Sequence, residues 1–177
     1  SDVYKRQHAD LRNSYNGNKF SHASAIRRCL DNSNVSVVSF GIRNISSGEI
    51  PFLKKNKKRI KIFWAKDKLK WNLNQLKKII RNKKVYLTFD VDGLDSSIMP
   101  ATGTPEPGGL FWDETMKIIK IAAQTSNIIG ADVNELSPIK GFNSYNFLVA
   151  KLAYKIIAYS FESVSYTHLT LPTNREV

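Results

Sequence analysis

Four short apolar runs constrain the fold of this chain more than any other feature. Each is rich in β-branched residues, and each has the length of a strand rather than that of a buried helix. Segments of helical periodicity separate most of them, which is typical of parallel strands whose two faces are covered. The runs are Val35–Ile42, Ile60–Trp64, Val85–Asp92 and Asn127–Leu136. The sequence therefore predicts an α/β fold with a mostly parallel sheet.

Apolar residues at helical spacing predict the helices between these strands. We expect helices over Ser24–Leu30, Lys68–Asn82, Asp113–Gln124 and Tyr145–Phe161, and a polar connection between the first two strands. The second helix would bury a stripe made of Leu69, Leu73, Leu76 and Ile80. The last would bury Phe147, Ala150, Tyr154, Ile157 and Phe161.

The chain is strongly basic, which raises the question of a nucleic-acid partner. Its 177 residues carry 27 Lys and Arg against 15 Asp and Glu, for a net charge of +12. No nucleic-acid-binding motif accompanies the lysines, so we interpret them as solvated helix and loop surface and expect no nucleic-acid partner. The other interpretation, a phosphate-binding surface, predicts binding that falls steeply with salt.

Cysteine content and hydropathy restrict the cellular environment that we expect for the chain. A single cysteine, Cys29, excludes an internal disulfide and any multi-cysteine zinc site, which favours a reduced, cytoplasmic environment. No apolar run approaches the roughly 18 residues that span a bilayer, so we expect no membrane partner.

The two ends of the chain do not match its middle. Ser1–Gln7 and Ser163–Val177 show no periodicity that continues their neighbours, and both resemble translated adaptor sequence. We therefore expect residues 8–162 to form one partial catalytic domain, and residues 1–7 and 163–177 to be foreign to it.

Two carboxylates mark the end of the third predicted strand. In Val85–Asp92 side chains alternate, so Asp90 and Asp92 would point the same way at the carboxyl end, where open α/β sheets bind ligands. Two ionised groups so close repel each other unless a cation lies between them, which suggests a divalent metal ion. The alternative is that one aspartate caps a turn while the other is solvated.

Further candidate ligands and an irregular loop lie elsewhere in the chain. His8 and Asp10 would share one face of an extended segment, and imidazole with carboxylates suits Mn, Fe or Zn. A loop rich in Gly and Pro, 100–110, follows the acidic strand end, as functional loops often do. The fourth strand ends near Glu135, which would face away from Asp132 and Asn134.

These motifs resemble those of the ureohydrolase family, which includes arginases and agmatinases. Phe89–Leu110 is similar to the family's long signature, and Asp132–Pro138 resembles its D-x-x-E-x-x-P block. His8-Ala9-Asp10 with Ser21–Ser24 resembles the D-A-H-x-D and downstream histidine motifs of agmatinase-like members. The resemblance covers residues 8–162.

The resemblance implies a three-layer α/β/α fold, incomplete at its N-terminus, and a site for two Mn²⁺ ions. His8 would bind one ion, Asp10 the other, Asp90 would bridge both, and Asp92 would complete the site of His8. His22 would shuttle protons and contact the substrate. Glu135 would hold the guanidinium group, with Thr104 beside it. Asp10 would also orient the attacking water.

The implied reaction is hydrolysis of agmatine to putrescine and urea, a step of polyamine biosynthesis. Guanidinobutyrase, formimidoylglutamase, arginase and a non-catalytic homologue are the alternatives, and the family suggests trimers or hexamers. Two motifs depart from the family: Arg6 and Gln7 replace its D-A pair, and its G-G-D-H block has no counterpart. We therefore expect the chain as given to bind manganese poorly and to be inactive.

Overall fold

The computed structural model describes residues 2–5 and 8–168, with side chains over residues 8–162. In this part of the chain a single sheet of parallel strands has the order β3-β2-β1-β4-β5. Its strands are β1 (Asp2–Lys5), β2 (Val37–Ile42), β3 (Ile60–Trp64), β4 (Lys84–Asp90) and β5 (Asn127–Asn134). The predicted parallel α/β class is confirmed.

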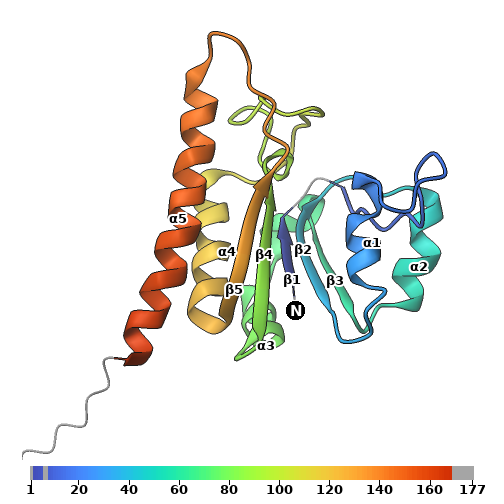
Figure 1. The fold of residues 1–177 in the computed structure, drawn as a ribbon, viewed down its shortest axis with the longest axis horizontal. Helices are drawn as coiled ribbons and strands as arrows, with labels where there is room; N and C mark the ends of the chain where they lie inside the picture. Colours follow the sequence, from blue (N-terminus) through green and yellow to red (C-terminus); the bar gives the residue numbers. More distant parts are fainter. Residues whose placement is uncertain (1, 6–7, 169–177) are drawn as a thin grey trace, which may run out of the picture.

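Helices cover both faces of this sheet (Figure 1). The helices are α1 (Ala25–Cys29), α2 (Ile50–Lys55), α3 (Leu73–Ile80), α4 (Trp112–Thr125) and α5 (Asn143–His168). Helices α1 and α2 lie on one face, whereas α4 and α5 lie on the other. The architecture therefore has the predicted three layers.

Each face of the sheet has its own apolar core. Phe40, Leu87 and Phe89 are fully buried in the larger core, together with Leu76 of α3 and Leu152 of α5. The smaller core joins the opposite face to α1 and α2, and its buried residues are Ala9, Leu11, Ile26, Leu30, Val37, Ile42 and Ile60. Because both faces are packed, the edge formed by the carboxyl ends of the strands is the natural place for a site.

Three predicted segments differ in kind as well as in bounds from the observed ones. The strand predicted over Val85–Asp92 ends at Asp90, and a 3-10 turn, η4 (Val91–Gly93), follows it. The helix predicted over Lys68–Asn82 is divided into η3 (Ala65–Lys70) and α3, because the Asn72 side chain accepts a hydrogen bond from the Asn74 amide and starts a new helix. The connection after β2 is also more regular than predicted, since it contains η2 (Ser47–Glu49) and α2.

The predicted apolar stripes are right in part. Leu76 and Ile80 are buried, but Leu69 lies in η3, outside the helix, and is 96% exposed. In α5 the predicted face is the wrong one, because Phe147, Ala150, Tyr154, Ile157 and Phe161 are all exposed. The buried residues of α5 form a second stripe, Val149, Leu152 and Ile156. Periodicity alone does not distinguish two such stripes on one helix.

The ends of the chain also enter the fold more than expected. Residues 2–5, which we expected to lie outside it, form β1 between β2 and β4. Helix α5 continues to His168, past the expected boundary at Glu162. The foreign origin of these ends stays a prediction, as does the division into one domain with two added ends. None of the helices in the described residues combines the length and the apolar character needed to cross a membrane.

Candidate functional site

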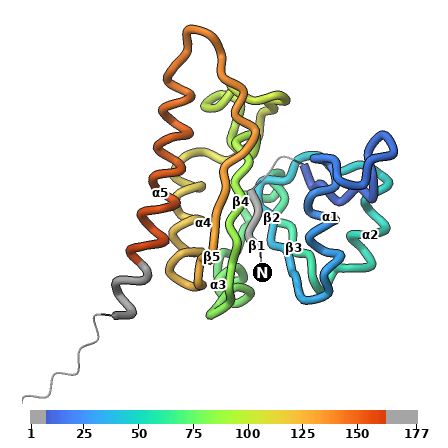
Figure 2. Tube along the Cα trace, viewed as in Figure 1, coloured from blue at the N-terminus to red at the C-terminus, as the bar shows by residue number. Residues whose placement is uncertain are grey.

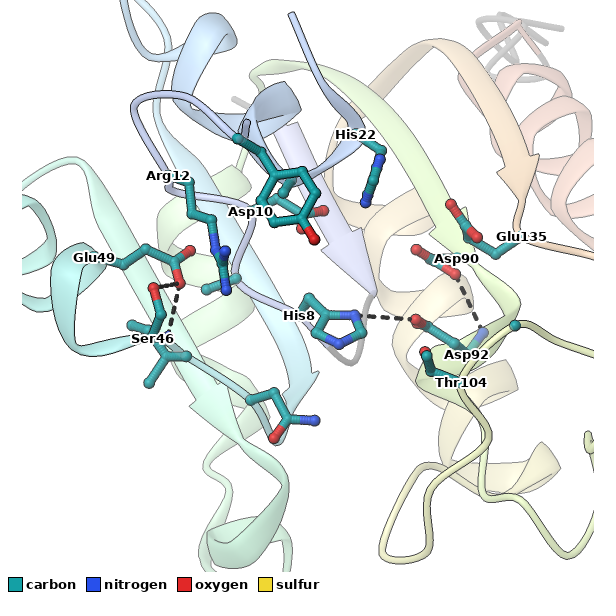
Figure 3. Close-up of a pocket in the computed structure, with 16 residues that line it drawn as sticks. His8, Asp10, Arg12, His22, Ser46, Glu49, Asp90, Asp92, Thr104 and Glu135 are labelled. Atoms are coloured by element: carbon teal, nitrogen blue, oxygen red, sulfur yellow. Dashed lines mark hydrogen bonds and ion pairs between the residues drawn. The ribbon is translucent and has the colours of Figure 1, made fainter. Parts of the chain in front are cut away.

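The candidate site lies at the carboxyl edge of the sheet, where segments that follow four of the strands meet. The strand order turns at β1, since β2 and β3 extend to one side of it and β4 and β5 to the other. A cavity of about 550 Å³ opens there. All seven predicted site residues line it (Figure 3): His8, Asp10, His22, Asp90, Asp92, Thr104 and Glu135. Such a turning point is where open α/β sheets bind ligands.

His8 and Asp92 form the pair that joins the two sides of the cavity. The His8 Nδ1 atom lies 3.4 Å from Asp92 Oδ2. The hydrogen bond to Asp92 raises the pKa of His8 above its ordinary value, against the opposite effect of burial. The main chain next to His8 is fixed as well, because the Ala9 amide donates to the Asn44 carbonyl after β2 at 3.3 Å. The imidazole is thus oriented by both of these neighbours.

Asp90 and Asp92 come together through a turn and not through strand alternation. Asp90 ends β4, and its Oδ1 atom accepts a hydrogen bond of 3.2 Å from the Asp92 amide in η4. Both side chains are buried, at 3% and 4% exposure, and both line the cavity. The expectation that they share a face of one strand is wrong, but the turn leaves them at the same site.

Two of the candidate carboxylates lie on strained backbone. Asp10 has φ 51° and Glu135 has φ 67°, values that side-chain-bearing residues adopt rarely. Glu135 follows the end of β5, where the Ser137 amide donates to the Ala101 carbonyl at 2.9 Å. This bond places the loops after β4 and β5 side by side (Figure 2). Such strain persists only where the surrounding structure holds it, and it is frequent at functional sites.

The loop that carries Thr104 is anchored by Asp95. The Asp95 carboxylate accepts hydrogen bonds from the Ser97 amide and hydroxyl and from the Gly108 and Gly109 amides, at 2.6–3.0 Å. Burial raises the pKa of Asp95, but these hydrogen bonds outweigh burial and hold that pKa below its ordinary value. A buried charge with this many donors fixes both ends of the loop.

Arg43 anchors the turn of Asp92 from the end of β2, on the other side of β1. Its guanidinium group donates to the Asp92 carbonyl at 2.6 Å and to the Gly93 and Gly41 carbonyls at 3.3 Å. Burial lowers the pKa of Arg43, in part offset by the negative charges of Asp92, Glu106 and Asp95. Arg43 follows β2, so these bonds join the ends of β2 and β4.

Sequence reasoning missed several residues that line the cavity. Arg12 and Tyr15 flank it, with the Arg12 guanidinium 5.2 Å from the centre of the Tyr15 ring. Tyr15 in turn meets the ring of His22 edge-on at 5.7 Å. The buried Glu49 also lines the cavity, and the pattern Ser46-Ser47-Gly48-Glu49 could have revealed it as part of a helix start.

The donor chemistry fits a divalent metal ion, but the described residues supply only part of a site. Imidazole from His8 with the carboxylates of Asp10, Asp90 and Asp92 suits manganese, iron or zinc. Within the described ranges, however, no three His, Cys, Asp or Glu side chains are arranged so that they could hold an ion. Further donors are therefore needed to complete a site.

Comparison with known proteins identifies the family of the chain. The model of the arginase family matches residues 7–159. The chain is 38% identical over 159 residues to the N(1)-aminopropylagmatine ureohydrolase of Synechocystis. The matched region covers 88% of this chain and 51% of that protein. It is 33% identical to the agmatinase of Pyrococcus horikoshii, over 86% of this chain and 53% of that protein. The chain thus spans about half the length of these relatives.

A solved structure supports the same assignment. The crystal structure of agmatine ureohydrolase of Thermoplasma volcanium superimposes with a TM-score of 0.79 at 30% identity, covering 96% of this chain and 57% of that one. The family model covers most of the chain and includes every residue of the predicted site. On this evidence, the chain belongs to the arginase family.

Proposed function

We propose that this chain is part of a binuclear manganese ureohydrolase that hydrolyses agmatine to putrescine and urea. The observation that carries the proposal is the convergence of seven residues, from segments after β1, β4 and β5, on one cavity in a chain of the arginase family. The names of the Pyrococcus and Thermoplasma relatives support the choice of agmatine. We further propose that the complete protein acts in the cytoplasm and assembles as a trimer or hexamer.

The proposed metal ligands are His8, Asp10, Asp90 and Asp92. Two manganese ions held there would supply a Lewis-acid centre that lowers the pKa of water and offsets the negative charge on the oxygen that attacks the guanidinium carbon. The Asp10 carboxylate would orient the attacking water. Burial of Asp90 and Asp92 keeps bulk water away from this end of the cavity.

Substrate binding and proton transfer are assigned to the other lining residues. The Glu135 carboxylate would pair with the cationic guanidinium group through charge-assisted hydrogen bonds, and Thr104 would contact the same group. His22 is exposed at the cavity, and an imidazole can act as a general acid, so it would donate the proton that the leaving amine requires.

A longer substrate is the second candidate. The Synechocystis relative is named for N(1)-aminopropylagmatine, which adds an aminopropyl group to the far end of agmatine. A cavity of about 550 Å³ has room for such a tail. Guanidinobutyrate, formimidoylglutamate and arginine stay as alternatives, as does a non-catalytic member of the family.

We propose that the chain as given is inactive because its ligand set is incomplete. Arg6 and Gln7 stand where the family has its D-A pair, and no three donors of the described residues form a metal site. We expect calorimetry to find weak manganese binding. Stoichiometric, tight binding of two Mn²⁺ ions by this chain would contradict the proposal.

The deciding experiment measures urea. A version of the protein in which Asp-Ala replaces Arg6-Gln7 and an added N-terminal segment carries the family's G-G-D-H motif is loaded with Mn²⁺ and given each candidate substrate in parallel. Agmatine should release urea with the highest kcat/KM, and replacing Glu135 with Gln should abolish this release. No urea from agmatine, aminopropylagmatine, arginine or guanidinobutyrate would overturn the proposed function.

A further inference from the structure

Glu49 is a buried acid for which the proposed reaction has no use. It is only 4% exposed, and both of its carboxylate oxygens accept hydrogen bonds. Oε1 accepts from the Leu11 amide at 2.7 Å, and Oε2 accepts from the amide and the hydroxyl of Ser46, also at 2.7 Å. Glu49 thus joins the turn before α2 to a segment 38 residues earlier in the chain.

The segment that Glu49 holds contains Asp10, one of the proposed metal ligands. Asp10 has φ 51°, and its side chain lines the cavity (Figure 3). Its carbonyl accepts from the Arg27 amide at 3.1 Å, in the first turn of α1, where helical amides lack partners within the helix. The peptide unit that follows Asp10 is therefore fixed at both polar groups, by Arg27 at the carbonyl and by Glu49 at the Leu11 amide.

A residue with a side chain in the left-handed region persists only where its surroundings fix it. A hydrogen bond to a charged acceptor is among the stronger hydrogen bonds in proteins. The bond from the Leu11 amide to the Glu49 carboxylate is therefore of the kind that can hold Asp10 in this conformation.

We propose that Glu49 is a positioning residue that holds the Asp10 backbone in its left-handed conformation and so directs the Asp10 carboxylate into the cavity. The consequence for metal binding rests on the proposed function. The competing explanation is that Glu49 merely stabilises the turn before α2 through Ser46. The two explanations differ in which amides lose protection when Glu49 is changed.

Amide hydrogen exchange of the full chain tests the proposal without metal. In Glu49→Ala, the amides of Leu11 and Arg27 should exchange at least ~10-fold faster than in the unchanged protein, after correction for any change in global stability. Arg27 does not donate to Glu49, so its faster exchange would report movement of Asp10 itself. Ser46→Ala removes only the hydroxyl bond to Glu49 and serves as the matched control, in which both amides should keep their protection.

A second variant covers the case in which Glu49→Ala does not fold. Glu49→Gln keeps an oxygen that can accept from the Leu11 amide, but its NH2 group then faces the Ser46 amide and leaves that donor without its acceptor. We expect it to retain the protection of the Leu11 and Arg27 amides. Equal exchange at Leu11 and Arg27 in Glu49→Ala and Ser46→Ala would overturn the proposal.

Manganese binding provides the second readout. Electron paramagnetic resonance of free Mn²⁺ should show an affinity about 10-fold weaker for Glu49→Ala than for Ser46→Ala, as expected when support of a ligand is lost. Equal affinity in these two variants would overturn the metal-positioning consequence. This readout uses the protein with its N-terminal motifs completed as described above. If that protein binds no Mn²⁺, the proposed function fails at this site, while the exchange measurement still decides the role of Glu49.

Discussion

The His8 imidazole and the Asp92 carboxylate face each other at 3.4 Å across the junction of β1 and β4. These residues follow β1 and β4, which are paired parallel neighbours in the sheet. Because Asp92 is buried and His8 is half-exposed, the pair presents one open side to the cavity. The sheet itself thus brings together the two side chains proposed to share a metal ion.

Replacing His8 should weaken metal binding more than replacing the other cavity histidine. We expect His8→Ala to lower the affinity for Mn²⁺ at least ~10-fold, because an imidazole ligand is lost. His22→Ala should leave this affinity nearly unchanged, since His22 is proposed to act on protons and not on the metal. Titration of Mn²⁺ followed by paramagnetic resonance measures both. Equal losses in the two variants would contradict the ligand assignment.

The Asp95 anchor should make stability depend on pH in the acid range. Because the pKa of Asp95 is lower in the folded protein than its ordinary 3.8, its contribution is present above 3.8 and is lost as the pH falls through the folded value. We expect Asp95→Asn to cost about 2 kcal/mol of unfolding free energy at pH 6. The gap between the two proteins should close below pH 3.8, as measured by urea unfolding at several pH values. If the difference in unfolding free energy between the two proteins did not change with pH, Asp95 would not hold the loop as a charged acceptor.

Gly109 should tolerate no side chain. A Cβ atom there would lie 2.5 Å from the carbonyl carbon and oxygen of Leu94 and 2.6 Å from the Asp95 amide nitrogen, and none of these backbone atoms is free to move aside. Gly109→Ala should therefore destabilise the protein by about 2 kcal/mol or more. Gly103→Ala is the matched control in the same loop, because a Cβ atom at Gly103 meets nothing within 4 Å. Thermal unfolding that ranks the two variants alike would contradict the close packing.

Replacing Arg43 with either an apolar residue or lysine should lower the stability of the protein. Arg43→Met leaves the Asp92 carbonyl without this donor, and we expect a loss of about 2 kcal/mol in chemical unfolding. Arg43→Lys should recover only part of that loss, since an ammonium group lacks the planar fork that reaches three carbonyls. Full recovery with lysine would show that charge alone matters at this position.

Much of the fold could be predicted because it depends on local patterns. β3 has the predicted bounds, and β2 and β5 lie within the predicted runs, since β-branched apolar residues specify buried parallel strands directly. The connection after β2 was predicted to be a polar segment and not a helix, although it contains α2. That helix has only 6 residues, and none of them is fully buried, so it leaves little periodicity to detect.

The candidate site could be predicted as a set of residues but not as a geometry. The motif residues around Asp90 lie close together in the sequence, and so do those around His8. The topology of a parallel sheet then brings the two motifs together at the strand ends. The supports of these residues could not be predicted. Glu49 meets Leu11 across 38 residues, and Arg43 meets Asp92 across 49, and no local pattern encodes contacts of this kind.

The central place of β1 has a consequence for how the chain folds. Residues Asp2–Lys5 precede both of their partners, and β4 is separated from them by the whole of β2, β3 and α3. Until β4 is available, a half-sheet of β3, β2 and β1 would expose β1 as an open edge, which other chains can pair with. Completion of the sheet therefore waits for contacts far apart in sequence, and such contacts slow folding. Any partly formed sheet that lacks β4 would therefore expose an edge that the complete sheet covers.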